Sequence, residues 1–465
     1  MNNSTDNIMD KKALYFTIEE LSKRGRDDIP KELKSGTGLV YSSPATLSYN
    51  APGAEGFGVK RAGLSVPGSV MLIVAPGCCG RNTSEISIIP RYRHRFFYLD
   101  MNENDLITGK HLSRISEAVG EVVKTITERW KEKKPDVVMI CITCVDALLG
   151  TDMERVCKKA TESTGVLVKP CYMYALTREG RKPPMVHVRQ SIYSMLMPQK
   201  RKGNEVNILG FFAPVMDEFE LYRYLKEAGV VKVRELGRME TYDDFMDMAR
   251  ANFNLVLNPE AAPAAEDLKN RLKMPYIELT RFYDIEKIRR QYRALSQALG
   301  IEINDDKDYE KCLEVVNRVS GKYKGTRISI GEVLNADSFE LAVALCKMGF
   351  KVVEIFALVE EEKYGNIDKL NEISKDTKVY SNMDPSMLYY DEYSVCEDKD
   401  SESDEQDGLV KLQKSYSACK VDLTIGKDAA VYHKDAKHVG FNSDIQPFGY
   451  AGLIKLMEEI EGALS

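Results

Sequence analysis

Two short segments contain the residues of this chain that are most able to do chemistry, and both carry a pair of cysteines. One is the turn 76–80, Pro-Gly-Cys-Cys-Gly, and the other is Cys141-Ile-Thr-Cys144. The turn directly follows the apolar run Ser69–Ala75, and its glycines permit unusual backbone angles and the close approach of a bulky group. On its own, the turn is equally consistent with a functional site and with a glycine turn that happens to contain thiols.

The second segment is expected to end a buried strand at the sheet edge that carries the turn. Residues three apart in a strand point to opposite faces, so we expect Cys141 to pack inside the sheet and Cys144 to emerge at its carboxyl edge. A structural zinc site is disfavoured because it needs four ligands, and no second CxxC segment or paired histidines lie nearby. A thioredoxin-type pair is disfavoured because there the cysteines open a helix. Thiolates gathered at one edge favour an iron–sulfur cluster, completed by a second subunit or a non-cysteine ligand.

The bulk composition is that of an ordinary globular protein. The chain has 465 residues, of which 43% are hydrophobic and 29% charged, which suggests about three domains. The net charge of −6 provides no basic field for nucleic acid. No apolar stretch approaches the ~20 residues of a membrane span, and the polar start 1–12 does not resemble a signal peptide. We therefore expect a cytoplasmic protein that binds neither nucleic acid nor membrane, in which most of the ten cysteines are simply buried.

Apolar, strand-like runs alternate with helical patterns along most of the chain, which is typical of parallel sheets. The unalternated runs 69–75 and 137–144 predict buried strands, and residues 112–131 carry apolar residues at helical spacing. We predict an α/β fold with three Rossmann-like doubly wound domains and parallel sheets. The predicted parts are an extended N-terminal region 1–65, a cysteine-bearing domain 66–203, a second domain 204–324, and a third domain 325–465 with a solvated acidic insertion 392–407.

A third feature is the segment Gly210–Asp217 at a predicted strand-to-helix turn. Its sequence, Gly-Phe-Phe-Ala-Pro-Val-Met-Asp, is neither a GxGxxG fingerprint nor a phosphate-binding P-loop. We find no nucleotide-binding fingerprint elsewhere in the chain.

Five short motifs follow one another along the chain: Pro76-Gly-Cys78, Thr143–Asp152, 207–212 with 217–225, 254–257 with 274–278, and 447–453. In this order they resemble the motifs of the nitrogenase component 1 family. That family of α/β subunits also includes nitrogenase-cofactor assembly scaffolds and the dark-operative protochlorophyllide and nickel-sirohydrochlorin reductases. Each motif is modest, but the ordered set is specific, and the resemblance runs from about residue 35 to the end.

The resemblance implies a cluster between two subunits, supplied with electrons by a separate ATP-hydrolysing iron–sulfur protein. Carried onto this sequence, it makes Cys78 and Cys144 cluster ligands, and Cys79 could replace or supplement Cys78. Nitrogenase subunits have an earlier ligand cysteine, whereas here no cysteine precedes Cys78. A [4Fe–4S] cluster shared across a dimer is therefore expected in place of an eight-iron cluster. The partner would be a second component 1-type subunit, either identical or paralogous.

The nitrogenase active-site cofactor hangs from one cysteine and one histidine, and the resemblance places these positions near Asn258 and near Phe441. Neither ligand is present, although His438 lies close by in sequence. We therefore expect that this protein does not carry that cofactor in the usual way and does not reduce dinitrogen; a different, unknown second metallocofactor stays open. The candidate pocket residues are Asn258, His438, Phe441 and Tyr450, and domain packing is the alternative explanation for each.

Three functions remain open from the sequence. The leading one is an enzyme, the subunit of a nitrogenase-like reductase that passes low-potential electrons through the interfacial cluster to a substrate. The second is a scaffold that holds a nitrogenase-cofactor precursor and catalyses nothing. The third is a non-redox, ligand-binding α/β protein whose cysteines are structural.

Overall fold

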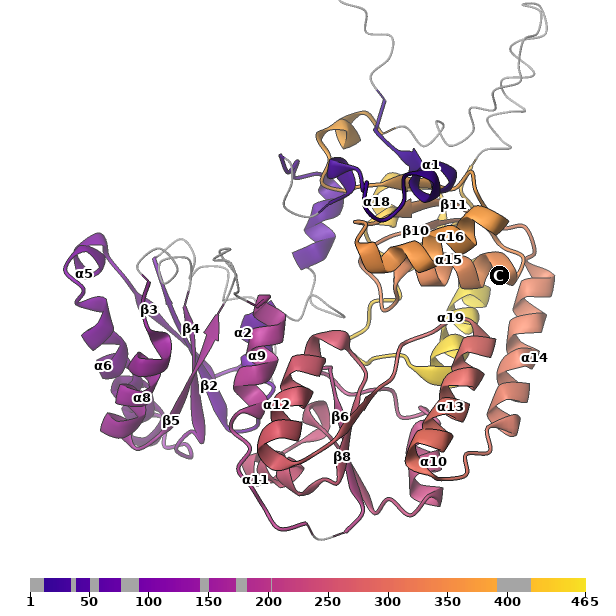
Figure 1. Cartoon of the computed structure of the whole chain (residues 1–465). Coiled ribbons are helices and arrows are strands. Elements are labelled where there is room, and N and C mark those ends of the chain that lie inside the picture. The colour runs from indigo at the N-terminus through magenta and orange to yellow at the C-terminus, as the bar shows by residue number, and fades with distance from the viewer. Residues whose placement is uncertain are drawn as a thin grey trace, which may run out of the picture. The chain divides into compact units, whose positions relative to one another are not determined.

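The computed structural model describes residues 12–34, 39–50, 58–76, 92–142, 150–172, 182–201, 203–390 and 420–465. Three predicted features lie outside these residues: the turn cysteines Cys78 and Cys79, the strand-end Cys144, and the acidic insertion 392–407. The chain divides into two compact units (Figure 1). Unit 1 comprises residues 1–56, 215–224 and 281–465, and unit 2 comprises residues 57–214 and 225–280.

Unit 2 contains two four-stranded parallel sheets with the same strand order. The first sheet has the order β3-β2-β4-β5 and the second has the order β7-β6-β8-β9. Both correspond to the start of the 2-1-3-4-5 order of flavodoxin-like, doubly wound folds. The strands are β2 (Ser69–Ala75), β3 (Phe96–Asp100), β4 (Val137–Ile142) and β5 (Leu167–Tyr172) in the first sheet, and β6 (Glu205–Leu209), β7 (Lys232–Glu235), β8 (Phe253–Val256) and β9 (Tyr276–Glu278) in the second.

Successive side chains of a strand point to opposite faces of the sheet, so alternate residues of the first sheet pack against helices on its two faces. Val70, Leu72 and Val74 join a core with α6 and α8, whereas Met71 and Ile73 join a core with α2 and α9; Figure 1 shows these helix pairs on opposite sides of the sheet. Helix α9 also packs on α12 beside the second sheet, so one core serves both sheets. The helical segments are α2 (Gly58–Gly63), α5 (Glu103–Ile107), α6 (His111–Lys124), η5 (Thr125–Arg129), α8 (Met153–Thr164), α9 (Pro184–Tyr193), η6 (Leu236–Arg238), α11 (Tyr242–Met246), η7 (Asp247–Arg250), η8 (Pro259–Ala261) and α12 (Ala262–Leu272).

Unit 1 contains a third sheet of six strands in the order β1-β12-β11-β10-β13-β14. Strand β1 is antiparallel to β12, and the other five are parallel with the 3-2-1-4-5 order of a Rossmann sheet. The predicted α/β fold with several parallel sheets is therefore confirmed. The strands are β1 (Phe16–Thr17), β10 (Arg327–Ile330), β11 (Lys351–Phe356), β12 (Lys378–Tyr380), β13 (Leu423–Ile425) and β14 (Lys437–Val439).

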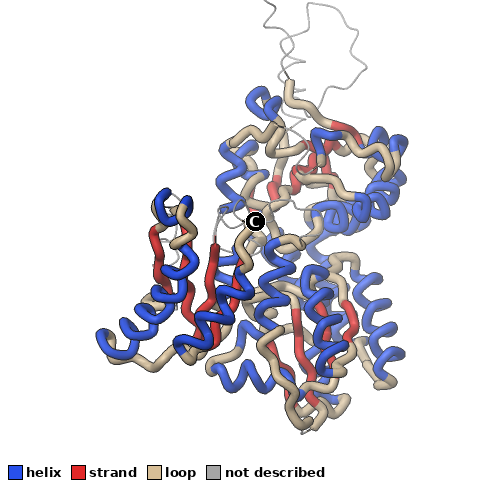
Figure 2. The backbone as a smooth tube through the Cα atoms, turned by 60° about the vertical axis from the view of Figure 1, so that its left-hand side comes forward, coloured by secondary structure: helices blue, strands red, loops and turns tan. Residues whose placement is uncertain are grey.

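Helices flank the strands of the third sheet as well (Figure 2). Helices α13 and α14 pack against α19 and belong to unit 1, although the sequence suggested a domain boundary near residue 324. Within the described residues, no helix is long and apolar enough to cross a membrane. The remaining helical segments are α1 (Ile18–Arg24), η1 (Lys31–Leu33), η2 (Pro44–Asn50), α10 (Leu221–Glu227), α13 (Ile285–Leu299), α14 (Asp306–Lys322), α15 (Ser338–Lys347), η9 (Glu361–Lys363), α16 (Tyr364–Ile373), η10 (Pro385–Tyr389), α18 (Ala429–Tyr432) and α19 (Gly449–Leu464).

The N-terminal region differs from the extended chain expected over residues 1–65. Helix α1 begins with a capping box, in which the Thr17 hydroxyl accepts from the Glu20 N–H at 3.2 Å and the Glu20 carboxylate accepts from the Thr17 N–H at 2.8 Å. Ile18 and Leu21 are fully buried. Residues 18–24 are therefore a buried helix, although extended chain was expected. The Gly- and Pro-rich turn signals of this region begin only near residue 35 and do not apply to this earlier segment.

Candidate functional site

The carboxyl ends of β2 and β4 lie side by side at the switch point of the first sheet. The two strands pair in parallel, with Val74 opposite Ile142. The chain leaves β2 toward β3 on one side and later returns past β2 to β4 on the other, so connections leave these two ends in opposite directions. Doubly wound sheets bind their ligands at such points. The predicted ligands follow these ends within a few residues and lie outside the described residues: Cys78, Cys79 and Cys144.

The end of β2 is held firmly from the neighbouring strand. The carbonyl oxygen of Ala75 accepts from the Tyr98 hydroxyl at 2.8 Å and from the Met101 N–H at 3.1 Å. The Tyr98 hydroxyl also lies 3.2 Å from an Asp100 carboxylate oxygen. The backbone that leads into the cysteine turn therefore starts from a fixed position.

Most of the cysteines within the described residues are buried in the cores. Cys141 and Cys171 are paired residues on β4 and β5, and neither is exposed, which confirms that Cys141 packs inside the sheet. Burial raises the pKa of Cys171 well above its usual value and raises the pKa of Cys312 to about 12. Such thiols stay protonated and are poor ligands and nucleophiles. Among the described residues, no group of three or more His, Cys, Asp or Glu side chains is arranged to hold a metal ion.

Asn258 lies at the switch point of the second sheet, just after β8. Strands β6 and β8 pair with Leu209 opposite Val256, and Gly210 follows β6 with a φ of 136°. A Cβ on Gly210 would lie 2.7 Å from the Asn258 backbone nitrogen, so the glycine is required for this close approach. The Asn258 side-chain oxygen accepts from the Glu260 N–H at 2.9 Å and caps η8. The contact made by this candidate pocket residue is therefore a local cap.

A buried arginine, which the sequence did not reveal, binds the backbone at the carboxyl end of β6 in the second sheet. Arg189 donates from Nε to the Gly210 carbonyl at 2.8 Å and pairs with Glu260 at 2.8 Å. Its guanidinium lies 4.5 Å from the centre of the Phe212 ring. The segment Gly210–Asp217, which matched no nucleotide motif, is thus held at its start by this arginine.

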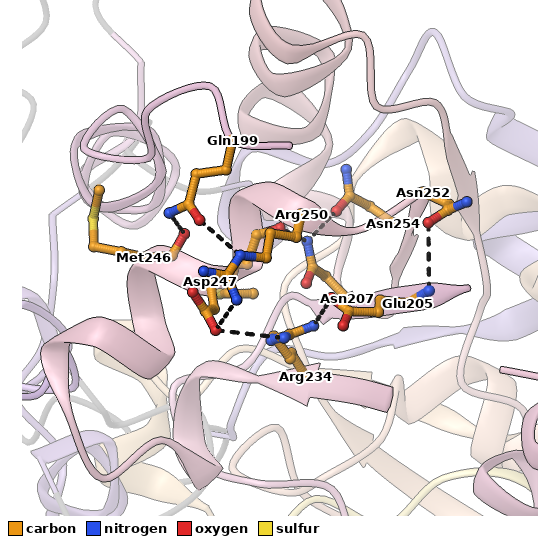
Figure 3. A network of polar contacts seen from close by, with 10 residues as sticks. Gln199, Glu205, Asn207, Arg234, Met246, Asp247, Arg250, Asn252 and Asn254 are labelled. Carbon is orange, nitrogen blue, oxygen red and sulfur yellow. Dashed lines mark hydrogen bonds and ion pairs between the residues drawn. The ribbon is translucent and has the colours of Figure 1, made fainter. Parts of the chain in front are cut away.

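A polar network crosses the second sheet (Figure 3). Asn207 on β6 faces Asn254 on β8, and its Nδ2 donates to Asn254 Oδ1 at 2.9 Å. Arg234 on β7 pairs with Glu205, and its guanidinium also lies 3.8 Å from Asp247. The sequence signal for this network was the asparagine inside each of two otherwise apolar strand runs. Its evident role is to join β6, β7 and β8.

Tyr450 is fully engaged at the start of α19. Its hydroxyl donates to Asp305 at 2.5 Å, and its backbone N–H donates to Glu220 at 2.7 Å. Glu220 also accepts from the Tyr292 hydroxyl at 2.5 Å and from the Ala451 N–H at 3.1 Å, so its carboxylate sits at the positive end of the helix. Burial raises the pKa of Tyr450, which keeps the phenol protonated. These contacts give Tyr450 a packing role in unit 1.

Phe441 and His438 occupy different surroundings in unit 1. Phe441 is buried, has a φ of 40°, and stacks edge-on against Tyr283 at 5.6 Å. It lines a cavity of about 230 Å³. His438 lies exposed on β14, where Nδ1 is 3.0 Å from the Thr424 hydroxyl. Desolvation of the ring atoms that lie against the protein lowers the pKa of His438 below its usual 6.5, although the residue as a whole is exposed, so the neutral ring predominates at pH 7.

The switch point of the third sheet, between β10 and β13, carries buried carboxyl groups that the sequence did not reveal. Asp428 is fully buried and accepts from the N–H groups of Glu332 at 2.7 Å and Val333 at 3.0 Å, and from Asn382 Nδ2 at 2.7 Å. The Tyr49 hydroxyl donates to Glu332 at 2.5 Å. Burial raises the pKa of both Asp428 and Glu332. The Asp428 carboxylate therefore occupies the position at this switch point where a ligand could otherwise bind.

A larger cavity, of about 790 Å³, opens in unit 2 at the amino ends of β2 and β4. It is on the edge opposite the carboxyl ends of these strands. Its basic groups already have partners: Arg95 donates to the carbonyls of Leu64 and Val66, each at 2.9 Å, and Lys133 pairs with Asp136 at 3.2 Å. This cavity is therefore a weaker candidate for the chemistry than the carboxyl edge.

These features define the class of the protein: an α/β protein with three doubly wound sheets, in one of which the strands that meet at the switch point are followed in sequence by cysteines. The family model for nitrogenase component 1 type oxidoreductases matches residues 55–465. The chain belongs to this family, and the family assignment made from the motifs is confirmed.

Curated relatives include proteins of cofactor assembly and of nitrogenase itself. The nitrogenase iron–molybdenum cofactor biosynthesis protein NifE of Clostridium pasteurianum is 27% identical over 50% of this chain and 49% of its own length. NifE of Sinorhizobium fredii is 25% identical over 75% and 72% of the two chains. The nitrogenase molybdenum–iron protein alpha chain of Methanococcus maripaludis is 22% identical over 63% and 61%. The match thus spans about half the length of the first of these relatives.

A solved structure has the same fold over nearly the whole chain. Nitrogenase Cp1 at pH 6.5 superimposes with a TM-score of 0.65 at 18% identity, covering 94% of this chain and 96% of that one. At this identity, the likeness concerns the fold alone.

Proposed function

We propose that this chain is a subunit of a nitrogenase-like reductase that passes low-potential electrons to a substrate other than dinitrogen. In this proposal Cys78 and Cys144 hold a [4Fe–4S] cluster between two subunits, and Cys79 replaces or supplements Cys78. The electrons come from an ATP-dependent iron–sulfur reductase protein. The observation that carries the proposal is the pairing of β2 and β4, because their adjacent carboxyl ends lead into the two cysteine turns.

The chemistry of the available donors supports a cluster at this edge. Cys171 and Cys312 are buried thiols with raised pKa values, so neither is a suitable thiolate donor, whereas the proposed ligands follow strand ends at a switch point. An iron–sulfur cluster bound by such thiolates supplies one-electron chemistry at low potential. In this proposal the chain itself holds the two cysteine segments at a fixed separation. The pairing of β2 with β4 and the two hydrogen bonds accepted by the Ala75 carbonyl oxygen support this role.

Two thiols per chain make a second subunit necessary for a four-cysteine site. That subunit is either a second copy of this chain or a paralogous component 1-type subunit. Size-exclusion chromatography with light scattering on anaerobically purified protein tests this point. A monomer that retains its iron would contradict the shared cluster.

The environments of the candidate cofactor positions favour a substrate other than dinitrogen. Asn258 caps η8, and Phe441 is a buried aromatic residue, so neither position offers the thiolate or imidazole from which the nitrogenase cofactor hangs. An acetylene- and dinitrogen-reduction assay with the reductase partner should therefore be negative. Ammonia formation from dinitrogen would overturn this part of the proposal.

The direct test of the cluster is anaerobic purification followed by iron and sulfide analysis and EPR spectroscopy. We expect about four irons and four sulfides per pair of chains, with absorbance near 400 nm that bleaches on reduction. A colourless protein without iron under these conditions would favour the third function, a non-redox ligand-binding protein.

A cofactor-assembly scaffold is the second candidate function, and the names of the NifE relatives favour it. The two functions differ in what happens to the metal. With reductase and ATP, a reductase subunit turns over a substrate many times and keeps its iron. A scaffold loses iron stoichiometrically to a cofactor-free acceptor protein and shows no turnover. Radiolabelled iron followed through such an incubation separates the two functions.

A further inference from the structure

Unit 1 contains four tyrosines whose rings lie in a row. The ring centre of Tyr292 is 5.3 Å from that of Tyr224 and 5.5 Å from that of Tyr450, and the ring centre of Tyr309 is 6.2 Å from that of Tyr450. These separations are typical of aromatic pairs in contact. Three of the four residues are at most 2% exposed, whereas Tyr309 is partly exposed. The tyrosine row, Tyr224-Tyr292-Tyr450-Tyr309, therefore connects the interior of unit 1 with its surface.

Each hydroxyl of the tyrosine row donates to a carboxylate of its own. The four donor–acceptor distances are 2.5 Å from Tyr292 to Glu220, 2.5 Å from Tyr450 to Asp305, 2.6 Å from Tyr224 to Asp308 and 2.6 Å from Tyr309 to Glu286. Burial raises the pKa of the three buried phenols, and the hydrogen bond to Glu286 raises the pKa of Tyr309, so all four phenols are protonated at neutral pH. Every phenolic proton of the row therefore already lies in a hydrogen bond to a base.

Cations and N–H groups favour the ionised form of the three less exposed acceptors. Both oxygens of Glu220 accept from backbone N–H groups at the start of α19, which opposes the rise in pKa that burial causes. Arg223 pairs with Asp308, and the Arg289 guanidinium lies 3.9 Å from an Asp305 oxygen. These carboxylates are therefore suited to take up a proton from the phenols that they bind.

We propose that the tyrosine row conducts oxidising equivalents between the interior of unit 1 and its surface. A strong one-electron oxidant, such as the radicals that dioxygen forms at reduced iron, removes one electron from a tyrosine of the row. In the same step the phenolic proton moves to the bonded carboxylate, which leaves a neutral tyrosyl radical and a carboxylic acid. The proton acceptor eases this oxidation because no phenol radical cation has to form in the protein interior. The proposal goes beyond the proposed function and does not depend on the cluster, because every group named belongs to unit 1.

The radical passes along the row by exchange between neighbouring tyrosines. It takes one electron from the next tyrosine, whose proton moves to that tyrosine's carboxylate, while the first tyrosine recovers its proton from its own carboxylic acid. Each exchange moves one electron one way and the oxidising equivalent the other way. At Tyr309 an organic one-electron donor in solution, such as ascorbate, supplies the last electron, and Glu286 returns the proton. The Arg289 guanidinium lies 4.1 Å from the centre of the Tyr309 ring and does not oppose this step, because the radical carries no charge.

The first test charges the row with light. The full chain is illuminated with a bulky ruthenium polypyridyl photosensitiser and persulfate and frozen after a set delay, and EPR spectroscopy measures the tyrosyl radical. Radicals on isolated exposed tyrosines are lost quickly because they couple in pairs, whereas a radical in the buried row should persist. Tyr309→Phe should remove most of the persistent signal, because Tyr309 is the exposed end of the row. Tyr283→Phe is the matched control and should keep it, since the buried Tyr283 hydroxyl donates to the Asn335 carbonyl at 2.6 Å and to no carboxylate. The proposal is overturned if the wild type gives no persistent radical, or if Tyr309→Phe retains the signal as fully as the control.

The second test separates conduction from a structural role of the hydrogen bonds. Glu286→Gln keeps an acceptor for the Tyr309 hydroxyl but cannot take up its proton at neutral pH. Charging of the row, and its discharge when ascorbate is added, should therefore each slow about tenfold or more in this variant. Glu310→Gln is the matched control, since Glu310 is an exposed neighbour of Tyr309 on α14 that does not bond to a tyrosine of the row. Circular dichroism and thermal melting verify that each variant is folded. A purely structural role predicts equal rates in the two variants, and that result would overturn the proposal.

Discussion

The first and third sheets each have a switch point at their carboxyl edge, but different residues occupy the two edges. In the third sheet, Asp428 accepts three hydrogen bonds from the loop after β10 and from Asn382, so the chain's own carboxylate fills the switch point. A Cβ on Gly331 would lie 2.1 Å from Asp428, which shows how completely the space is used. In the first sheet, the strand ends that meet at the switch point are followed in sequence by cysteines. The strand order thus determines where a binding site can form, and the residues that follow the strand ends determine whether a ligand or the chain itself occupies that place.

The largest expected effect comes from removing the cysteines of the first edge. Cys78→Ala and Cys144→Ala should each abolish the cluster, because two thiols per chain leave no spare ligand apart from Cys79. Cys346→Ala, which changes a partly exposed cysteine of unit 1, is the control and should keep full iron. Iron analysis and EPR spectroscopy measure the outcome. If both ligand variants retain full iron, the proposed site is wrong.

The corresponding change at the third edge should cost stability and leave the iron content unchanged. Asp428→Ala removes the acceptor of three buried hydrogen bonds, so we expect the free energy of unfolding to fall by about 3 kcal/mol. Asp435→Ala is a suitable control, because that side chain is 70% exposed. Urea unfolding followed by circular dichroism compares the variants. Equal stability of the two would contradict a filled and essential edge.

The pH dependence of stability should sharpen the comparison further. Burial raises the pKa of Glu332 above its usual 4.5, so the folded state holds this proton more tightly than the unfolded state does. The stabilisation is complete below pH 4.5 and is lost as the pH rises through the raised pKa. Glu332→Gln removes this titration, so its stability should vary less with pH than that of the wild type between pH 4 and 8. Urea unfolding at a series of pH values gives the unfolding free energy as a function of pH. The same pH dependence in the variant and the wild type would contradict the effect.

The smallest effect is expected at the end of β2. Tyr98→Phe removes the hydroxyl that donates to the Ala75 carbonyl, but the Met101 N–H remains bound to the same oxygen. We expect a loss of about 1 kcal/mol or less in unfolding free energy. Faster hydrogen exchange at the Met101 amide would localise the loosening. A loss as large as that of Asp428→Ala would show that this single bond, and not the pairing of the strands, holds the edge.

The parallel-sheet fold was accessible from the sequence because buried parallel strands leave a strong local pattern. The apolar run 69–75 coincides with β2, and the run 137–144 contains β4. The sequence also placed the cysteines at the carboxyl ends of these two runs, whereas the strand order that makes this edge a switch point came from the structure. The family motifs reinforced this prediction because they fall on the same turns.

The polar residues that complete the third edge were not accessible in the same way. Asp428 meets Glu332 from 96 positions away in the sequence, and neither belongs to a local motif. Tyr49 comes from still farther away, in a region expected to be extended chain. Such contacts arise only when the sheet assembles. Local patterns predicted the strands, whereas the partners of buried charges depended on tertiary structure.

The single core shared by the first and second sheets has a consequence for any attempt to divide this protein. Helix α9 packs on β5 with one face and on α12 with another, and its Val188 and Ile192 are fully buried. A fragment truncated after residue 203 would lose α12 and leave apolar side chains of α9 open to water. Such a fragment should aggregate during expression. The cysteine-bearing edge therefore has to be studied in a polypeptide that retains the second sheet.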